Sequence, residues 1–365
     1  MIRIPVAAPS RSYDVLLENG LLARAGESLG RILANRRVFI VTVPPVRRRW
    51  AKALLQSLDG AGIQADVLEM LDGERFKRLT TLEKLAAKLA KLGADRSATL
   101  IALGGGVVCD VTGFLASIYM RGVDVIQVPT TVLAQVDAAI GGKTGVNLQS
   151  GKNLLGTFHQ PRMVLIDPGV LTTLPSREYR AGLYEALKCG IIGAPGLFRL
   201  LEERRREILD REPSVVEKVI AESVRLKASV VSADEREGGL RQVLNLGHTI
   251  GHALEAETHY TRLLHGEAVA WGMVAATNIA LSIGKLDSIE GGRITHAILG
   301  LGKLPRMQIS TASILKRLRS DKKTRGGVVH FILPRDIGKV EIVADVPETI
   351  VRSAVDEIRK LASGR

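Results

Sequence analysis

The segment Thr99-Leu-Ile-Ala-Leu103 runs directly into Gly104-Gly105-Gly106, and an apolar helical pattern follows over residues 107–119. A short apolar run that ends in glycines and continues as a helix predicts a buried strand, a tight turn and a crossover helix. The turn offers bare backbone N–H groups at the positive end of the helix, which suits a diphosphate. Cys109 stands where a strict dinucleotide motif has its third glycine, and three glycines can also form only a tight turn. We favour a dinucleotide site.

Strand and helix patterns alternate on both sides of this turn. Further strands are predicted at 37–42, 64–69 and 123–128, and further helices at 50–61 and 79–93. Such alternation predicts a parallel sheet with helices on both faces. Beyond Leu171 the pattern changes to long helical periods, with one hairpin-like stretch at 328–333, so we place a domain boundary between Pro168 and Pro175.

The composition restricts the compartment and the partners. The 365 residues suffice for two domains, and they include only two cysteines, no signal peptide and no apolar run of membrane-spanning length. We therefore expect a cytoplasmic protein without a membrane partner. The formal net charge is +13, but the basic residues are dispersed and no nucleic-acid motif accompanies them. Lysine and arginine serve a phosphorylated or carboxylated small substrate equally well, so we expect no nucleic-acid partner.

Histidines gather in Asn245-Leu-Gly-His248-Thr-Ile-Gly-His252 and in His265-Gly266-Glu267. His248 and His252 are four residues apart and would share a helix face, a spacing that is familiar for metal pairs. Glu185, in a helical stretch, could supply the oxygen of a two-histidine, one-carboxylate site with an open coordination position. Such a pair is also often one core histidine and one surface histidine.

Glycines stand beside these histidines at positions 247, 251 and 266. Glycine lowers helix stability, so its presence here indicates that something approaches the backbone closely. A metal, a substrate or tight helix packing would each explain it. His259 has no such glycine and is predicted to be a loop residue.

Residues 128–153 are dense in glycine and polar side chains. Their two lysines, two asparagines and one aspartate do not favour a packed core, and they suit a loop that closes on a phosphate. This is not a P-loop, because Gly142-Lys143-Thr144 matches the end of that motif but Asp137 occupies the position of its first glycine. Upstream, residues 72–77 combine a turn with acceptors for ribose hydroxyls and a cation.

Together these segments resemble the 3-dehydroquinate synthase family of sugar phosphate cyclases. The matching motifs cover about residues 72–335 and lie, in chain order, at 104–110, 121–122, 128–137, 141–147, 151–153, 182–188, 234–241, 245–252 and 265–273. The resemblance implies an α/β Rossmann-like domain over residues 1–170, a mainly α-helical domain over residues 171–365, and an active site in the cleft between them. It also implies a tightly held NAD, one divalent metal ion (zinc or cobalt) and a homodimer.

The resemblance further implies a reaction. Members of the family convert 3-deoxy-D-arabino-heptulosonate 7-phosphate to 3-dehydroquinate and phosphate, the second step of the shikimate pathway to chorismate and the aromatic amino acids. An alcohol is transiently oxidised by NAD, which acidifies the neighbouring C–H. Phosphate elimination, reduction of the ketone, ring opening and an intramolecular aldol reaction follow, so the sequence is redox-neutral overall.

The family's pattern implies roles for individual residues of this chain. Its metal ligands correspond to Glu185, His248 and His265, so His252 is a substrate-facing acid–base group and not the second member of a metal pair. The cofactor positions correspond to Asp72, Gly73, Glu74, Lys77, Gly105, Gly106, Asp110, Thr130, Thr131, Lys143, Lys152, Val170 and Thr173.

The substrate positions are implied in the same way. Lys227 and Arg241 correspond to the pair that holds the substrate carboxylate, and the polar wall is completed by Asp137, Lys152 and Lys188. The phosphate-binding set corresponds to Lys143, Asn153, Asn245, one of Lys322 and Lys323, and Arg121 of the partner subunit.

The chain departs from the family's pattern at two places. Cys109 replaces a usual glycine, a change from one small residue to another. The segment Thr42-Val43-Pro44-Pro45-Val46 lacks the acidic residue that usually binds the adenosine ribose. Arg47-Arg48-Arg49 follows, and these arginines either form a solvated first helical turn, which we favour, or tolerate the 2′-phosphate of NADP. We expect NAD, bound about 1 kcal/mol more weakly for the lost hydrogen bond.

Three alternatives have to be weighed against this interpretation. Another sugar phosphate cyclase would make a cyclitol and alter the carboxylate and phosphate positions, yet Lys227, Arg241 and Asn245 stand as 3-dehydroquinate synthases have them. A metal-dependent alcohol dehydrogenase of the glycerol dehydrogenase type would need no such set of cations. A scaffold protein with an inactive enzyme fold is hard to reconcile with the matching polar residues at every position of the family's site.

Overall fold

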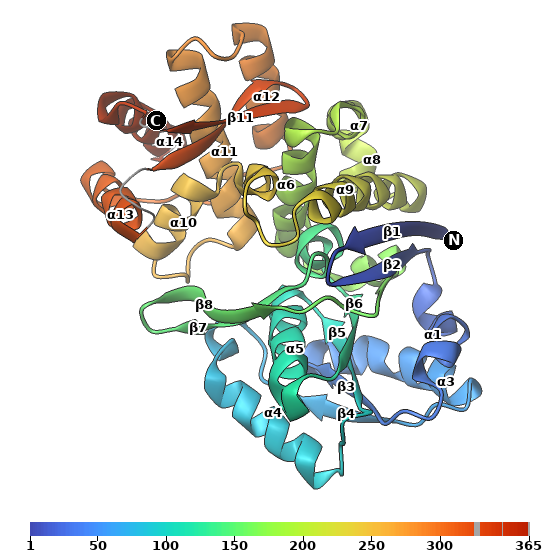
Figure 1. Ribbon diagram of the computed structural model, residues 1–365. Helices are drawn as coiled ribbons and strands as arrows, with labels where there is room; N and C mark the ends of the chain where they lie inside the picture. The colour runs from blue at the N-terminus through green and yellow to red at the C-terminus, as the bar shows by residue number, and fades with distance from the viewer. Residues whose placement is uncertain (325–328, 345, 364–365) are drawn as a thin grey trace. The chain divides into compact units, whose positions relative to one another are not determined.

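The computed structural model describes residues 1–324, 329–344 and 346–363, without the side chains of residues 320–324 (Figure 1). The chain divides into two compact units. The first, called the sheet unit here, comprises Met1–Leu174 and Val216–Arg236; the second, the helical unit, comprises Pro175–Val215 and Glu237–Arg365. The sequence predicted a single boundary between the two domains. It did not predict that Val216–Arg236 belongs to the sheet unit.

A seven-stranded sheet forms the centre of the sheet unit, in the order β1-β2-β9-β6-β5-β3-β4. The strands are β1 (Ile2–Ala8), β2 (Arg11–Leu17), β3 (Val38–Thr42), β4 (Ala65–Glu69), β5 (Thr99–Gly104), β6 (Asp124–Pro129) and β9 (Met163–Ile166). Only the pairing of β1 with β2 is antiparallel. The expected parallel sheet is therefore confirmed, and an N-terminal hairpin that the sequence patterns did not indicate extends it.

Helices cover both faces of this sheet because the central strands bury both of their faces. Val38 and Ile40 of β3 belong to one core cluster, and Phe39 and Val41 belong to the other. Successive side chains of a strand point to opposite faces, so a continuous apolar run supplies both cores. The helices of this part of the chain are α1 (Ala25–Leu33), α2 (Pro44–Val46), α3 (Lys52–Gly60), α4 (Leu79–Lys91) and α5 (Gly106–Ile118).

The polar segment that was expected to be a loop is instead a hairpin of β7 (Lys143–Leu148) and β8 (Gly151–Phe158). Val146 of β7 is fully buried and Leu155 of β8 packs against the same core cluster. Gly113 of α5 makes room for the hairpin, because a Cβ there would lie 2.4 Å from Thr144 Cγ2. The prediction of a loop was wrong because it was based on the content of glycine and polar residues, although Val146 and Leu155 give the hairpin an apolar contact with the core.

The helical unit consists mainly of helices with one two-stranded hairpin. Its elements are α6 (Ser176–Ile192), α7 (Pro195–Glu203), α8 (Arg205–Leu209), α10 (His248–Glu257), α11 (His265–Ser282), α12 (Ser288–Gly300), α13 (Thr311–Thr324), α14 (Glu348–Ser363), β10 (His330–Asp336) and β11 (Lys339–Ala344). Between them, α9 (Pro213–Ala233) carries the chain back into the sheet unit from Val216 onward. Over the described ranges, none of the helices has the length and apolar character needed to span a membrane.

Candidate active site

The glycine-rich turn joins β5 to α5 as expected. A Cβ at Gly104 would lie 2.5 Å from Val108 Cγ2, and one at Gly105 would lie 3.0 Å from Thr131 Cγ2, so the turn has no room for side chains there. The backbone N–H of Thr130 donates to the carbonyl of Gly104 at 2.9 Å, which joins the predicted threonine pair to the turn. Cys109 is buried, and burial raises the pKa of its thiol. The thiol is therefore neutral and packs like any small apolar side chain.

Lys77 brings together predicted site residues that lie far apart in the sequence. Its ammonium donates to Asp110 Oδ2 and to Asn153 Oδ1, at 2.5 Å in each case, and the side chain is buried. Burial raises the pKa of Asp110, and the adjacent ammonium opposes that shift. The segment 72–77, the start of α5 and the β7–β8 hairpin therefore meet at one place.

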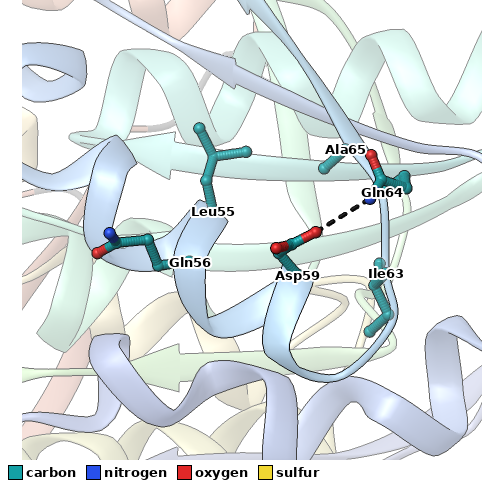
Figure 2. Close-up of a pocket in the computed structure, with 6 residues that line it drawn as sticks. All are labelled: Leu55, Gln56, Asp59, Ile63, Gln64 and Ala65. Carbon is teal, nitrogen blue, oxygen red and sulfur yellow. Dashed lines mark hydrogen bonds between the residues drawn. The ribbon is translucent and has the colours of Figure 1, made fainter.

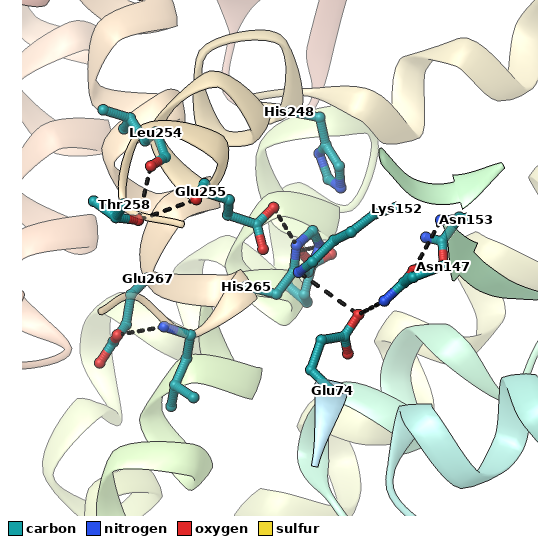
Figure 3. Close-up of polar contacts among 12 residues, drawn as sticks. Glu74, Asn147, Lys152, Asn153, His248, Leu254, Glu255, Thr258, His265 and Glu267 are labelled. Atoms are coloured by element: carbon teal, nitrogen blue, oxygen red, sulfur yellow. Dashed lines mark hydrogen bonds and ion pairs between the residues drawn. The ribbon is translucent and has the colours of Figure 1, made fainter. Parts of the chain in front are cut away.

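Asn147 extends this network, although the sequence analysis assigned it no role. Its side-chain amide donates to Glu74 Oε1 at 2.8 Å, and its oxygen accepts from the backbone N–H of Asn153 at 2.9 Å. Lys152 Nζ lies 3.8 Å from the same Glu74 oxygen (Figure 3). Asn153 has a φ of 54°, a left-handed conformation that asparagine tolerates better than most residues. Asn147 is buried next to Val146 in β7.

The return of α9 to the sheet unit positions the predicted carboxylate-binding lysine. Lys227 Nζ donates to Asp137 Oδ1 at 2.5 Å and to the Asp137 carbonyl at 2.6 Å, and its side chain is buried. Two more predicted cations are exposed: Lys143 begins β7, and Arg121 follows α5 with a φ of 68°. Thr173 accepts a hydrogen bond from Trp50 Nε1 at 3.2 Å.

A hollow on the sheet unit lies away from these residues. It is lined by Leu55, Gln56, Asp59, Ile63, Gln64 and Ala65, and Gln64 donates to Asp59 at 3.0 Å (Figure 2). Ala65 begins β4, whereas the glycine-rich turn follows the end of β5, and β3 pairs in parallel with both strands. The hollow therefore lies at the amino ends of the strands, opposite to the predicted cofactor positions.

In the helical unit, a glycine contact places a histidine beside Glu185. A Cβ at Gly266 would lie 1.8 Å from the carbonyl oxygen of Ala181, so α11 begins in direct backbone contact with α6. Ala181 and Glu185 are one turn apart on α6 and share a face. His265, the first residue of α11, consequently has its Nε2 atom 3.7 Å from Glu185 Oε1.

Helix α10 is held against α11 in the same way. Gly247 has a φ of 78°, and its carbonyl oxygen lies 1.8 Å from the position of a Cβ at Gly272. A Cβ at Gly251 would lie 3.0 Å from the carbonyl oxygen of Ala268. Among the explanations for the glycines beside the histidines, tight helix packing is the one that the structure shows directly. The packing in turn brings the histidines together.

Glu185, His248 and His265 offer ligand atoms that all lie within 4.8 Å of one another. His248 Nδ1 lies 3.1 Å from the carbonyl of Leu246, which can only accept, so Nδ1 donates and Nε2 keeps its lone pair. Burial, followed by the charge of Lys188, lowers the pKa of His248 well below its usual value, so this ring is neutral. Glu185 is buried and accepts from Lys188 through Oε2, while its Oε1 atom accepts no hydrogen bond.

His252 and Glu255 also lie close to His265. These three residues form a second group whose ligand atoms lie within 4.8 Å, and Glu255 Oε2 is 3.3 Å from His265 Nδ1. His252 is exposed, and its ring centroid is 5.2 Å from that of His248 (T-shaped). Figure 3 shows the contact of Glu255 with His265. Glu255 was not predicted from the sequence, although it lies one helical turn after His252.

The remaining predicted substrate positions, Asn245, Arg241, Lys322 and Lys323, belong to the helical unit. Asn245 donates from Nδ2 to Glu237 Oε1 at 2.8 Å, so Glu237 is another polar residue that the sequence analysis did not select. Arg241 is buried, with 1% of its surface exposed. The side chains of Lys322 and Lys323 lie outside the described residues, so their predicted contact with phosphate stays a prediction.

The chain matches two family models in succession. The 3-dehydroquinate synthase N-terminal model covers residues 67–181, and the corresponding C-terminal model covers residues 182–324. The chain is also 52% identical over 363 residues to the 3-dehydroquinate synthase of Koribacter versatilis (strain Ellin345), covering 99% of each. It is 45% identical to that of Gloeobacter violaceus, covering 98% of this chain and all of the relative.

Solved structures of other enzymes have the same architecture. ValA, the 2-epi-5-epi-valiolone synthase of Streptomyces hygroscopicus subsp. jinggangensis 5008 with NAD⁺ and Zn²⁺ bound, is 31% identical with a TM-score of 0.88, covering 96% of this chain and 98% of that one. A 2-deoxy-scyllo-inosose synthase complexed with carbaglucose-6-phosphate, NAD⁺ and Co²⁺ is 26% identical with a TM-score of 0.88, covering 98% and 99%. Glycerol dehydrogenase from Schizosaccharomyces pombe shares the fold, at 17% identity and a TM-score of 0.71 over 100% and 91%.

Proposed function

The chain belongs to the 3-dehydroquinate synthase family, and from this we propose that it converts 3-deoxy-D-arabino-heptulosonate 7-phosphate to 3-dehydroquinate and phosphate. It is a carbon–oxygen lyase that acts on a phosphate ester. The observation that carries this conclusion is the 52% identity to a 3-dehydroquinate synthase over both units of the chain.

The cofactors are NAD and one divalent metal ion, zinc or cobalt, as in the two solved sugar phosphate cyclases. The residues fit a metal: Glu185 has a buried oxygen without a hydrogen bond, and a neutral His248 directs a lone pair from Nε2. We propose that these two residues and His265 hold the ion, since two imidazoles and one carboxylate suit zinc or cobalt with an open position. When bound, NAD and the metal supply transient hydride acceptance and polarisation of the reacting hydroxyl.

The dinucleotide is proposed to lie along the network around Lys77. Side-chain-free backbone at Gly105 and Gly106 suits the diphosphate at the start of α5. The remaining proposed contacts are Asp72, Gly73, Glu74, Lys77, Asp110, Thr130, Thr131, Lys143, Lys152, Val170 and Thr173.

Cations hold the two anionic ends of the substrate in this proposal. Lys227 and Arg241 bind the carboxylate by charge-assisted hydrogen bonds, and Asp137 holds Lys227 in place before the substrate arrives. The phosphate is bound by Lys143, Asn153, Asn245, one of Lys322 and Lys323, and the partner subunit's Arg121. His252 transfers a proton to or from the substrate, because it is exposed and lies outside the group formed by Glu185, His248 and His265. Lys152 and Lys188 complete the polar wall.

A cytoplasmic homodimer is part of the same proposal. The exposed Arg121 follows α5 in a left-handed conformation, which presents its side chain at the surface of the sheet unit. If Arg121 completes the phosphate site of the partner subunit, a monomer has no complete phosphate site and should be inactive. Mixing Arg121→Ala subunits with subunits inactivated at His252 should therefore restore part of the activity, since half of the hybrid sites would contain both residues. No recovery on mixing would contradict the shared site.

The experiment that tests the activity separates this enzyme from the cyclitol synthases. The metal- and NAD-loaded protein is incubated with the heptulosonate phosphate, and phosphate and 3-dehydroquinate are assayed together. Equal amounts of both products are expected. Turnover of heptose or hexose phosphates that lack the carboxylate, without turnover of the heptulosonate, would contradict the proposal and favour a cyclitol product.

The Lys227→Met variant tests whether this lysine causes the preference for a carboxylated substrate. The parent should prefer the carboxylated substrate strongly, and the variant should lose most of that preference because a hydrogen-bonded charge is removed. Lys218→Met is the matched control, since Lys218 is exposed on the same helix. An unchanged preference in the Lys227 variant would show that this lysine does not bind the carboxylate.

A further inference from the structure

Glu255 is a buried carboxylate that has no assigned role in the proposed reaction. Only 1% of its surface is exposed, and it lies in α10 between the exposed His252 and the end of the helix. Burial of a charged carboxylate is unfavourable unless hydrogen bonds or charges compensate for it. A buried acid beside a metal-binding histidine therefore indicates a role in that site.

The two nitrogens of His265 face different carboxylates. Nε2 lies 3.7 Å from Glu185 Oε1, and Nδ1 lies 3.3 Å from Glu255 Oε2. An ionised carboxylate can only accept a hydrogen bond, so the proton of a neutral imidazole belongs on Nδ1 and the lone pair on Nε2. The geometry thus directs the free lone pair toward Glu185 and His248.

We propose that Glu255 is a positioning residue that fixes the tautomer and ring orientation of His265 and strengthens it as a metal ligand. The inference rests on the proposed function, because that function supplies the metal. Carboxylates that accept from the second nitrogen of a metal-binding histidine orient the ring and raise its basicity. Glu255 acts through His265 and does not touch the substrate.

The other histidine ligand is oriented by a different kind of group. His248 Nδ1 faces the carbonyl of Leu246, a neutral backbone acceptor that no side-chain substitution removes. Of the two histidine ligands, His265 is the one whose Nδ1 atom faces a charged side chain. A change at Glu255 should therefore weaken one ligand selectively and leave the other in place.

Cobalt binding to the full-length protein tests this inference without a measurement of turnover. Metal-free parent, Glu255→Gln and Glu255→Ala are titrated with Co²⁺, and affinity and the visible cobalt absorption spectrum are recorded. We expect a loss of affinity of roughly 10–100-fold in Glu255→Ala, as is usual when an outer carboxylate is removed. Glu255→Gln should lose less, because its amide oxygen still accepts from Nδ1. Both spectra should differ from that of the parent, since the field at His265 changes.

Glu257→Gln is the matched control. Glu257 lies on the same helix and pairs with Arg317 at 3.0 Å, away from the histidines. Its variant should bind cobalt with the affinity and the spectrum of the parent. Circular dichroism of the metal-free proteins shows whether each variant is folded, and Glu255→Gln keeps the test open if the alanine variant is not.

Three results would overturn the inference. Parental affinity and spectrum in the Glu255→Gln and Glu255→Ala variants would show that His265 is oriented without this carboxylate. A second cobalt ion per chain that disappears in Glu255→Ala would make Glu255 a direct ligand of an ion shared with His252. A parent that binds no cobalt would remove the site itself. By contrast, a parent that binds cobalt in a Glu255-dependent way but releases no phosphate would retain the inference and contradict the proposed function.

Discussion

His252 and His265 lie in one cluster but have different surroundings. His265 faces Glu185 and Glu255, whereas His252 is exposed and belongs only to the group formed with Glu255 and His265. We therefore predict that His265→Ala loses both bound metal and turnover. His252→Ala should keep the metal and lose turnover by roughly 10²–10⁴-fold, which is typical of a missing general acid or base.

Elemental analysis and steady-state kinetics on the same two preparations measure both quantities. His259→Ala is a suitable control, because His259 is exposed and lies outside both groups of potential ligands. Loss of metal from the His252 variant with retention in the His265 variant would reverse the assignment of ligand and proton donor.

The arginines after β3 bear on the choice between NAD and NADP. Arg47 lies 3.3 Å from Glu69, and Arg49 donates to the carbonyl of Pro45 at 3.3 Å, so two of the three are engaged locally. All three residues are exposed, as a solvated helical turn requires. This favours the interpretation that the run is not a recognition element for a 2′-phosphate.

Calorimetric titration of cofactor-stripped protein should accordingly show NAD binding more tightly than NADP. Arg48→Ala should change neither affinity, because the favoured interpretation leaves this exposed side chain in solvent. Tighter binding of NADP, lost in Arg47→Ala, would instead make the arginine run part of the cofactor site.

At the scale of elements, the sequence indicated the buried strands better than the polar ones. The run Thr99–Leu103 and its glycines predicted β5, the turn and α5, because burial on both faces leaves a continuous apolar signal. The β7–β8 hairpin was missed, since glycines and polar residues interrupt its apolar pattern. Glu255 was missed for a related reason: a single acid on a helix carries no signal of what its side chain contacts.

The contact between α11 and α6 supports a prediction about stability. A Cβ at Gly266 would meet the backbone carbonyl of Ala181 at 1.8 Å, and backbone cannot move aside cheaply. Gly266→Ala should therefore destabilise the protein by roughly 1–3 kcal/mol, the range for overpacking, and weaken metal binding by moving His265.

Gly292→Ala provides the control, because nothing lies within 4 Å of its Cβ position in α12. That variant should be more stable than the parent by roughly 0.5–1 kcal/mol, since alanine favours a helix over glycine. Urea unfolding of both metal-free variants measures the difference. Equal stability of the two variants would show that α11 can move away from α6.

At the scale of the whole molecule, the sequence predicted a sheet domain followed by a helical one but not the return of the chain. Residues Val216–Arg236 have the helical pattern of their neighbours, so no local signal separates them from the helical unit. Their membership is decided by distant contacts, such as Lys227 with Asp137 and Glu235 with Ser10. Periodicity reports which side of a helix is buried, and it cannot report against which part of the chain.

The net charge of +13 supports the last prediction. The proposed substrate carries a phosphate and a carboxylate, so a positive protein attracts it over a distance comparable to the Debye length, about 10 Å at 0.1 M salt. Raising the ionic strength should therefore lower kcat/KM several-fold while changing kcat much less, because the bound substrate is shielded from salt. Sodium chloride and potassium acetate should act alike at equal ionic strength, whereas sulfate should inhibit more by competing for the phosphate position. A kcat/KM value that does not depend on ionic strength would show that the net charge plays no part in substrate capture.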